Sequence, residues 1–170
     1  MAFKKFVREI PDFPKPGVVF RDITPIMADA KAFSETIEAM SSPVRAMEPT
    51  HVMGLESKGF IFGSALAMHL GLGFVPARRV GRLPCKTIQE KYSSEHEDLA
   101  LEIHADAFGN GDRVLIVDDV LATGGTAAAA KRLVERTGAH PVALTLFIEL
   151  SGLTGREALK GLPVFSVMRC

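Results

Sequence analysis

The segment from Val114 to Thr126, which reads Val-Leu-Ile-Val-Asp-Asp-Val-Leu-Ala-Thr-Gly-Gly-Thr, restricts the possible folds of this chain more than any other. It begins with a short, wholly apolar run rich in β-branched residues, which is typical of a parallel strand covered on both faces. Asp118 and Asp119 follow where this strand is predicted to end, and ligands of open α/β sheets bind beyond the carboxyl ends of strands. The segment therefore predicts an α/β domain with a binding site at this edge.

The residues after the two carboxylates form a predicted loop with very little side-chain bulk: Ala122, Thr123, Gly124, Gly125 and Thr126. Its N–H groups can converge on a phosphate, helped by the positive end of a helix predicted over 126–136. The alternative is an ordinary strand–turn–helix junction, and we expect Thr123 to be the N-cap and Gly138 the C-cap of the helix. The block is neither a Walker A loop nor a dinucleotide fingerprint.

Composition narrows the class of protein further. A chain of 170 residues corresponds to one domain. Lys plus Arg and Asp plus Glu number 20 each, so the formal net charge is zero, which argues against nonspecific nucleic-acid or membrane binding as the main role. Cys85 and Cys170 have no metal-ligand spacing and suggest a reducing, cytoplasmic location. We find no secretory signal and no apolar run of membrane-spanning length.

The rest of the chain shows an alternating α/β pattern with two unusual segments. Four prolines between Ile10 and Pro25 predict an extended, non-helical path. The polar segment 82–108 is long for a compact domain, and we interpret it as a mobile β-hairpin over the active site. The remaining predicted helices are 29–47 and 59–70, and the remaining strands are 51–55, 74–77, 142–148 and 164–168.

Cations follow two other predicted strands. At the strand–helix junction Leu55–Phe60, the N–H groups from Ser57 onward and the ammonium of Lys58 could face an anion; the alternative is a solvated lysine at a helix start. Guanidinium forks bind phosphate oxygens well, and three arginines follow the strand predicted at 74–77: Arg78, Arg79 and Arg82. The alternative for the arginines is a solvated basic loop.

Two more groups are ambiguous on their residues alone. The apolar segment around Phe20 could hold a flat heteroaromatic ligand, with backbone groups of Val19 and Arg21 at its edge, or could simply dock on the core. Glu95 and His96 could act as acid or base, or could be two surface residues of a polar loop.

These motifs occur together, and in the same order, in the type I phosphoribosyltransferases, which the chain resembles from about residue 13 to residue 164. The segment 114–126 is similar to the loop with which that family binds 5-phosphoribosyl-1-pyrophosphate (PRPP). The other matching motifs are Phe-Pro-Lys-Pro-Gly-Val-Val-Phe-Arg-Asp at 13–22, Gly-Leu-Glu-Ser-Lys-Gly-Phe at 54–60 and Tyr-Ser-Ser-Glu at 92–95. The motif at 13–22 is specific to the branch of the family that uses adenine.

The resemblance implies a central parallel β-sheet flanked by helices, a small N-terminal hood at about 10–28 and a flexible hairpin at about 82–104. It implies a purine salvage enzyme that transfers 5-phosphoribosyl from PRPP to adenine, giving AMP and pyrophosphate, with Mg²⁺ carried by PRPP or pyrophosphate. Members are typically homodimers, and by position Arg82 would reach the site of the other subunit. No nucleic-acid or membrane partner is implied.

Residue roles carry over by position. Ala122 to Thr126 would bind the 5′-phosphate, Asp118 and Asp119 would hold the ribose hydroxyls and associated metal, and Glu95 would handle the purine proton. Pyrophosphate would be bound by Ser57, Lys58, Arg78, Arg79 and Arg82. Adenine would be bound by Val19, Phe20, Arg21 and Leu150.

Three residues depart from the family pattern: Lys58 replaces a usual Arg, His96 a usual Tyr and Glu97 a usual Gly. They bear on loop closure and turnover more than on substrate class. Two other functions remain, a 6-oxopurine phosphoribosyltransferase and a PRPP-sensing regulator on the same fold. The Val-Val-Phe-Arg segment argues against the first, and the neutral charge balance argues against the second.

Overall fold

A computed structural model of the protein describes residues 3–93 and 98–170, apart from the side chains of Ser93 and Asp98. The chain divides into two compact units, Met1–Glu38 and Ala39–Cys170. Within the described ranges, no helix has the length and apolar character needed to cross a membrane.

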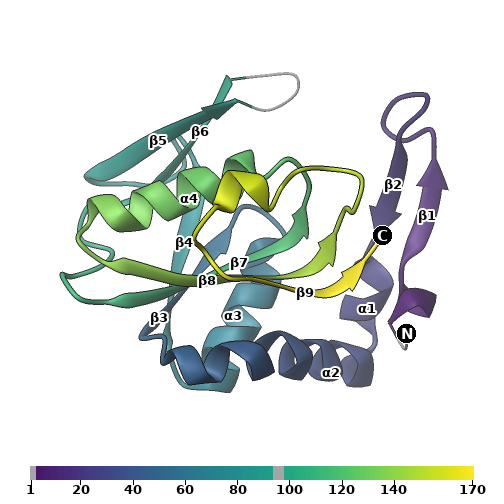
Figure 1. The fold of residues 1–170 in the computed structure, drawn as a ribbon, viewed down its shortest axis with the longest axis horizontal. Coiled ribbons are helices and arrows are strands. Elements are labelled where there is room, and N and C mark those ends of the chain that lie inside the picture. The colour runs from purple at the N-terminus through teal and green to yellow at the C-terminus, as the bar shows by residue number, and fades with distance from the viewer. Residues whose placement is uncertain (1–2, 94–97) are drawn as a thin grey trace. The chain divides into compact units, whose positions relative to one another are not determined.

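The larger unit contains a seven-stranded sheet with the order β5-β6-β4-β3-β7-β8-β9 (Figure 1). The five strands β4, β3, β7, β8 and β9 run parallel, and the hairpin β5–β6 pairs antiparallel with β4 at one edge. This confirms the predicted α/β architecture with a central parallel sheet, to which the hairpin adds two antiparallel strands. The strands are β3 (His51–Leu55), β4 (Gly73–Arg79), β5 (Thr87–Ser93), β6 (Asp98–His104), β7 (Arg113–Leu121), β8 (His140–Glu149) and β9 (Val164–Arg169).

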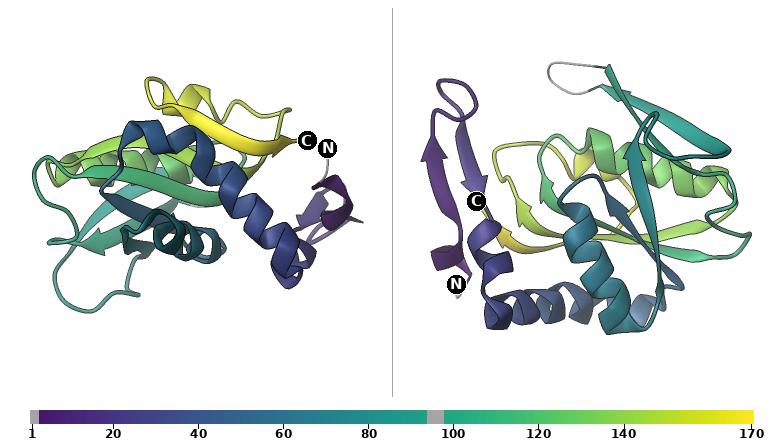
Figure 2. Two further views of the ribbon diagram at one scale, coloured as in Figure 1. Left: turned by 90° about the horizontal axis from the view of Figure 1, so that it is seen from below. Right: turned by 180° about the vertical axis from the view of Figure 1, so that it is seen from behind.

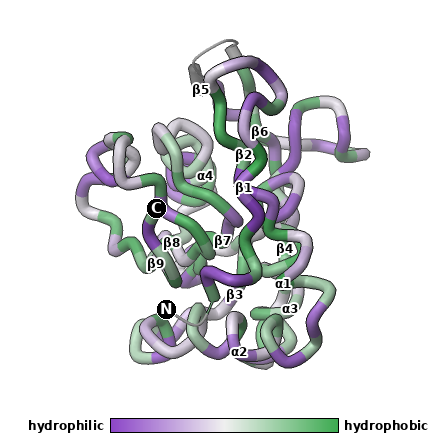
Figure 3. Tube along the Cα trace, turned by 90° about the vertical axis from the view of Figure 1, so that its right-hand side faces the viewer, coloured by the Kyte–Doolittle hydropathy of each residue, from purple (hydrophilic) through white to green (hydrophobic). Residues whose placement is uncertain are grey.

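Helices α3 (Gly59–Leu70) and α4 (Gly125–Arg136) connect parallel strands and cover opposite faces of this sheet (Figures 1 and 2). Phe62 of α3 stacks on Phe147 of β8, with ring centroids 5.9 Å apart. On the other face, Ile116 of β7 packs in one buried cluster with Leu133 of α4. Because both faces are covered, the central strands are hydrophobic along most of their length (Figure 3).

Most predicted elements are confirmed. The differences concern the residues at which elements begin and end. The strand at 51–55 and the helix at 59–70 have the predicted bounds. The helix predicted over 29–47 is instead α2 (Ala30–Ser41) followed by the 3₁₀ helix η2 (Ser42–Met47), because Pro43 cannot donate a backbone hydrogen bond within an α-helix. A further 3₁₀ helix, η3 (Glu157–Leu159), precedes β9.

The smaller unit begins with the 3₁₀ helix η1 (Lys4–Phe6), followed by an antiparallel pair, β1 (Arg8–Pro11) and β2 (Val19–Asp22). The short helix α1 (Thr24–Ala28) comes next. The predicted extended path over 10–25 is therefore wrong at its end. Pro25 lies in the first turn of α1, where its missing N–H needs no acceptor.

Candidate functional site

Two carboxylates lie near the carboxyl end of β7. Asp118 and Asp119 are part of the strand rather than beyond it, because β7 continues to Leu121 beside β8. Burial, reinforced by the neighbouring charge of Asp119, raises the pKa of Asp118 well above its ordinary value. The start of α3 closes over this position, since a Cβ on Gly59 would lie 3.1 Å from Asp118 Oδ1. The pair is thus a compact acidic centre at the predicted edge.

Lys58 connects the second predicted motif to this acidic centre. Its Nζ lies 3.0 Å from Oδ2 of Asp119, whose side chain is 15% exposed. The contact arises because β3 and β7 are adjacent parallel strands, so the residues that follow β3 lie beside the end of β7. Lys58 and Asp119 were predicted to bind different parts of a ligand, and their pairing with each other was not predicted.

The predicted phosphate loop is shorter than expected. Helix α4 begins at Gly125, and its N-cap is Gly124, with φ +84° and no side-chain cap bond, so the prediction of Thr123 as N-cap is wrong. A hydroxyl-bearing side chain is disfavoured in this left-handed conformation. The C-terminal prediction is close: Thr137 is the C-cap, and Gly138 follows it with φ +86°.

The loop encloses a small pocket of about 80 Å³, lined by Asp118 and by residues 120–127. The first N–H groups of α4 have no acceptor within the helix, and they carry the positive end of its dipole. A pocket lined by such donors and by small side chains has the chemistry of a phosphate site. The structure therefore brings the five predicted loop residues and Asp118 into one pocket.

Gly155, which was not among the predicted site residues, packs against this loop. A Cβ on Gly124 would lie 2.5 Å from the Gly155 carbonyl oxygen and 2.9 Å from Cβ of Ala158. A Cβ on Gly155 would in turn overlap the Ala122 carbonyl oxygen and the Leu121 side chain. The two glycine backbones therefore pack directly on each other. Nothing in the sequence distinguishes Gly155 from Gly152 and Gly161, the other two glycines between β8 and β9.

The predicted basic residues lie at the end of β4 and in the following loop. Arg78 and Arg79 are the last residues of β4 and do not follow it, which corrects the predicted strand end. Arg78 Nε lies 3.3 Å from Glu56 Oε2, which also accepts the Arg79 N–H at 2.9 Å. Arg78 Nη1 donates to the Arg82 carbonyl at 3.1 Å, so the three arginines are held near one another. Glu56 was not foreseen.

Glu102 of β6 anchors the loop that contains Arg82. Its side chain is buried and accepts the N–H groups of Arg82 and Leu83, both at 2.9 Å. The Thr87 hydroxyl donates to the other oxygen at 3.1 Å. Burial opposes ionisation, but these donors outweigh it and lower the pKa of Glu102. The Glu102 carboxylate therefore holds the loop that contains Arg82 and Leu83 close to Thr87, the first residue of β5.

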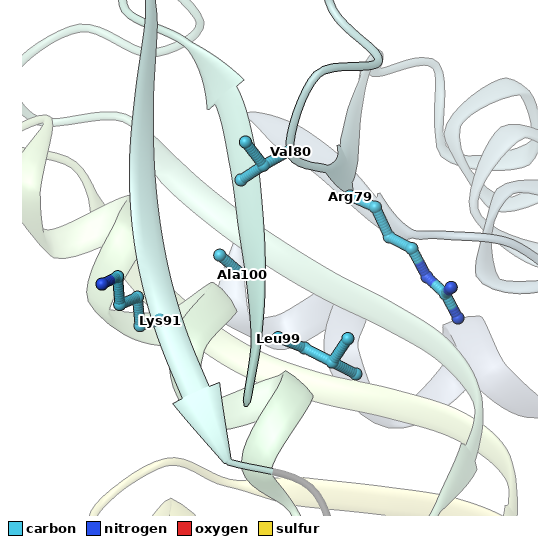
Figure 4. A pocket seen from close by; sticks show the side chains of 5 residues that line it. All are labelled: Arg79, Val80, Lys91, Leu99 and Ala100. Atoms are coloured by element: carbon cyan, nitrogen blue, oxygen red, sulfur yellow. The ribbon is translucent and has the colours of Figure 1, made fainter. Parts of the chain in front are cut away.

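An open groove of about 420 Å³ lies between the end of β4 and the hairpin, lined by Arg79, Val80, Lys91, Leu99 and Ala100 (Figure 4). Val80 continues the pairing beyond β4 by donating its N–H to the Ala100 carbonyl at 3.3 Å. The groove gives one of the predicted pyrophosphate residues, Arg79, an open surface that it shares with hairpin residues. The predicted hairpin is confirmed as β5–β6, whereas Glu95, His96 and Glu97 fall outside the described residues.

The residues predicted to contact a heteroaromatic ring are divided between the two units. Val19, Phe20 and Arg21 lie in β2 of the smaller unit, where the Phe20 ring meets Phe13 edge-on at 5.3 Å. Nε of Arg21 is buried, and within the described ranges no hydrogen-bond partner is found for it. Leu150 follows β8 in the larger unit and donates its N–H to the Leu121 carbonyl at 3.0 Å.

Comparison with known proteins identifies close relatives along nearly the whole chain. The family described as the phosphoribosyl transferase domain matches residues 26–165. An adenine phosphoribosyltransferase from Carboxydothermus hydrogenoformans is 50% identical and is matched over 99% of both chains. A crystal structure of this enzyme from Rhodothermus marinus has a TM-score of 0.94 at 48% identity, covering 99% of this chain and 97% of that chain. A Saccharomyces cerevisiae structure complexed with adenine and D-2,5-dideoxy-2,5-imino-altritol 1,6-bisphosphate has a TM-score of 0.94 at 37% identity, covering 98% and 97%.

Proposed function

Because the chain belongs to the phosphoribosyl transferase family, and within it to the adenine phosphoribosyltransferases, we propose an assignment of its residues to the two substrates. The enzyme serves purine salvage: it transfers 5-phosphoribosyl from PRPP to adenine, giving AMP and pyrophosphate. We further propose that it works in the cytoplasm, which the two free cysteines Cys85 and Cys170 support.

The 5′-phosphate of PRPP binds in the pocket at the start of α4. The observation that carries this assignment is the 80 Å³ pocket lined by residues 120–127, into which the unpaired N–H groups of the first helical turn can donate. Thr123 and Thr126 add hydroxyl donors. Asp118 lines the same pocket, so a ribose attached to the bound phosphate would lie beside the acidic centre.

The acidic centre and the cations stabilise opposite charges in the transition state. Breaking the bond between C1 and pyrophosphate builds positive charge on the ribose and negative charge on the leaving group. Asp118 and Asp119 face the positive charge on the ribose. The negative charge on pyrophosphate is bound by Ser57, Lys58, Arg78, Arg79 and Arg82. Groups fixed in advance near developing charge are effective because they need no reorganisation during the reaction. The hydrogen bonds of Glu56 and Glu102 support this arrangement.

The donor set fits Mg²⁺ that arrives with the substrate. Mg²⁺ usually keeps several waters and binds through one or two carboxylates together with substrate phosphates. Asp118 and Asp119 would hold it in this way, and the ion would neutralise charge on pyrophosphate.

Adenine binding is assigned to β2 of the smaller unit, where the backbone of Val19 and Arg21 reads the edge of the base and Phe20 lies against its ring. In the larger unit, contact of Leu150 with the ring stays a prediction. Glu95 of the hairpin takes up the proton lost from adenine as the new bond forms. Closure of the hairpin would exclude water, which otherwise competes with adenine for the electrophilic ribose.

The function is tested by measuring pyrophosphate release from PRPP and Mg²⁺ with adenine, hypoxanthine, guanine, xanthine or no base. We expect release with adenine only. Release with a 6-oxopurine would contradict the assignment of the base-binding segment around Phe20. Binding of PRPP without release for any base would contradict catalysis and favour the PRPP-sensing regulator.

We also propose that the enzyme is a homodimer in which α3 contributes to the contact. Met68 is 87% exposed and Ile61 is 43% exposed, so the outer face of this helix carries two exposed apolar side chains beside the exposed Ser64 and His69. The helix begins directly after Lys58, so a second subunit seated here would lie close to the basic part of the site.

Replacing Met68 by glutamate is expected to shift the protein from dimer to monomer, because each interface would bury a new charge without a partner. Light scattering after size-exclusion chromatography measures the mass. The control is Asn110→Glu, which adds the same carboxylate to an exposed turn at the base of the sheet and should leave the mass unchanged. A dimeric Met68→Glu protein would contradict this interface.

A further inference from the structure

The loop after β8, which we call the wall (residues 151–158), packs against residues that line the phosphate pocket. In the segment 151–158, Gly155 alone is buried, and the residues on either side of it are exposed. Its backbone lies against Ala122 and Gly124, so closely that neither glycine has room for a side chain. The position of Gly155 therefore limits how the phosphate loop can curve.

Arg156 anchors this wall to the sheet. Its Nε and Nη2 donate to the two carboxylate oxygens of Glu149 at 2.5 and 2.7 Å, and its Nη1 donates to the Val164 carbonyl at 3.0 Å. The backbone hydrogen bonds around Gly155 are otherwise local turns, such as Glu157 N–H to the Thr154 carbonyl at 2.9 Å. A two-pronged contact to one carboxylate fixes direction as well as distance. Arg156 thus determines where the residue before it lies.

Glu149 is a rigid base for this contact. It is 8% exposed at the end of β8 and also accepts the Ser166 hydroxyl at 2.7 Å and Arg169 Nε at 3.1 Å. Hydrogen bonding to Arg156, which outweighs the effect of burial, lowers its pKa from 4.5 to about 2. The carboxylate therefore stays ionised throughout the neutral range, and the contact persists there.

We propose that Glu149 and Arg156 are positioning residues for PRPP: by holding Gly155 against Ala122 and Gly124, they set the spacing of the N–H groups that receive the 5′-phosphate. This inference rests on the proposed binding of that phosphate by residues 122–126. The pair acts through the backbone of Gly155. Loss of the Glu149–Arg156 pair therefore weakens binding of the phosphate end of PRPP and leaves adenine binding largely intact.

The test compares Arg156→Lys with Arg169→Lys. Both changes replace an arginine on the same carboxylate, but only Arg156 is next to Gly155. Lysine keeps the charge and loses the planar fork. We expect Arg156→Lys to raise KM for PRPP about 10-fold, as the loss of a charged two-pronged contact suggests. KM for adenine and kcat should stay within about 2-fold of the parent, as should all constants of Arg169→Lys.

Three measurements separate positioning from a general structural role. Thermal unfolding verifies that each variant is folded at the assay temperature, and calorimetric titration with PRPP should reproduce the kinetic change as a weaker Kd. A lower Tm with unchanged PRPP affinity would overturn the inference, as would equal losses for PRPP and adenine. A parent protein that fails to bind PRPP would instead refute the proposed phosphate site.

A second variant tests the connection through Gly155. Gly155→Ala forces the wall away from Ala122, so it should weaken PRPP binding by the same route. The double variant Gly155→Ala with Arg156→Lys should then bind PRPP no more than about 2-fold more weakly than Gly155→Ala alone, because changes that act through one contact are not additive. Full additivity would mean that Arg156 acts independently of Gly155 and would overturn the inference.

Discussion

Replacing Gly124 by alanine is expected to lower kcat/KM for PRPP by about 100-fold or more, equivalent to about 2.7 kcal/mol or more. With φ +84°, Gly124 adopts a backbone conformation that costs other residues about 1–2 kcal/mol. The added methyl would also lie 2.5 Å from the Gly155 carbonyl oxygen, which is backbone and cannot move aside as a flexible side chain can. Relief of this overlap requires the phosphate loop to shift.

Gly161→Ala is the matched control for this change. Gly161 has nearly the same backbone angle, φ +85°, but no atom lies within 4 Å of the position of its added Cβ. It should lose some stability, about 1 kcal/mol, and keep the kinetic constants of the parent. Steady-state kinetics and thermal unfolding of both variants give the comparison. Equal kinetic losses at Gly124 and Gly161 would show that backbone strain alone, and not the contact with Gly155, explains the effect.

Asp119→Asn should lower kcat by about 100- to 1000-fold, the range found when one fixed electrostatic contact to a transition state is removed. The substitution keeps the shape of the side chain and removes the charge that would face the ribose as its positive charge develops. The substitution also removes the ionic contact of 3.0 Å between Lys58 and residue 119. Single-turnover measurements of pyrophosphate release report the chemical step directly.

Asp112→Asn provides the comparison at the opposite end of β7. Asp112 lies 3.5 Å from His51 and accepts the Gly109 N–H at 2.7 Å, a bond that an amide oxygen can also accept. Its replacement should leave kcat within about 2-fold of the parent. If Asp119→Asn raised KM for PRPP and left kcat unchanged, Asp119 would bind ground and transition states equally, contrary to the assigned role.

Local patterns predicted the parts of the site that follow single strand–helix junctions. The apolar run before Asp118 indicated a buried parallel strand, and β3 and α3 have the predicted bounds, whereas β7 continues past its predicted end to Leu121. Thr123 was the wrong N-cap because the side-chain preference for capping was considered without the backbone angle, and φ +84° at Gly124 favours glycine.

The supporting contacts could not be predicted because they join residues far apart in the sequence. Glu102 of β6 binds the N–H of Arg82, and Glu56 binds Arg78 from the turn that follows the neighbouring strand β3. An isolated glutamate in a sequence gives no indication of which distant donor it will meet. Only the pairing of strands in space selects these partners, as it does for Lys58 and Asp119.

The ion pair between Lys58 and Asp119 has a consequence for release of the leaving group. The carboxylate of Asp119 is tethered next to the ammonium, so it acts as a built-in competitor at a fixed, high effective concentration. If Lys58 binds pyrophosphate as proposed, its affinity is the attraction to pyrophosphate minus the attraction to Asp119. Under this assignment, the ammonium would return to Asp119 when pyrophosphate departs, which would lower the free-energy cost of product release.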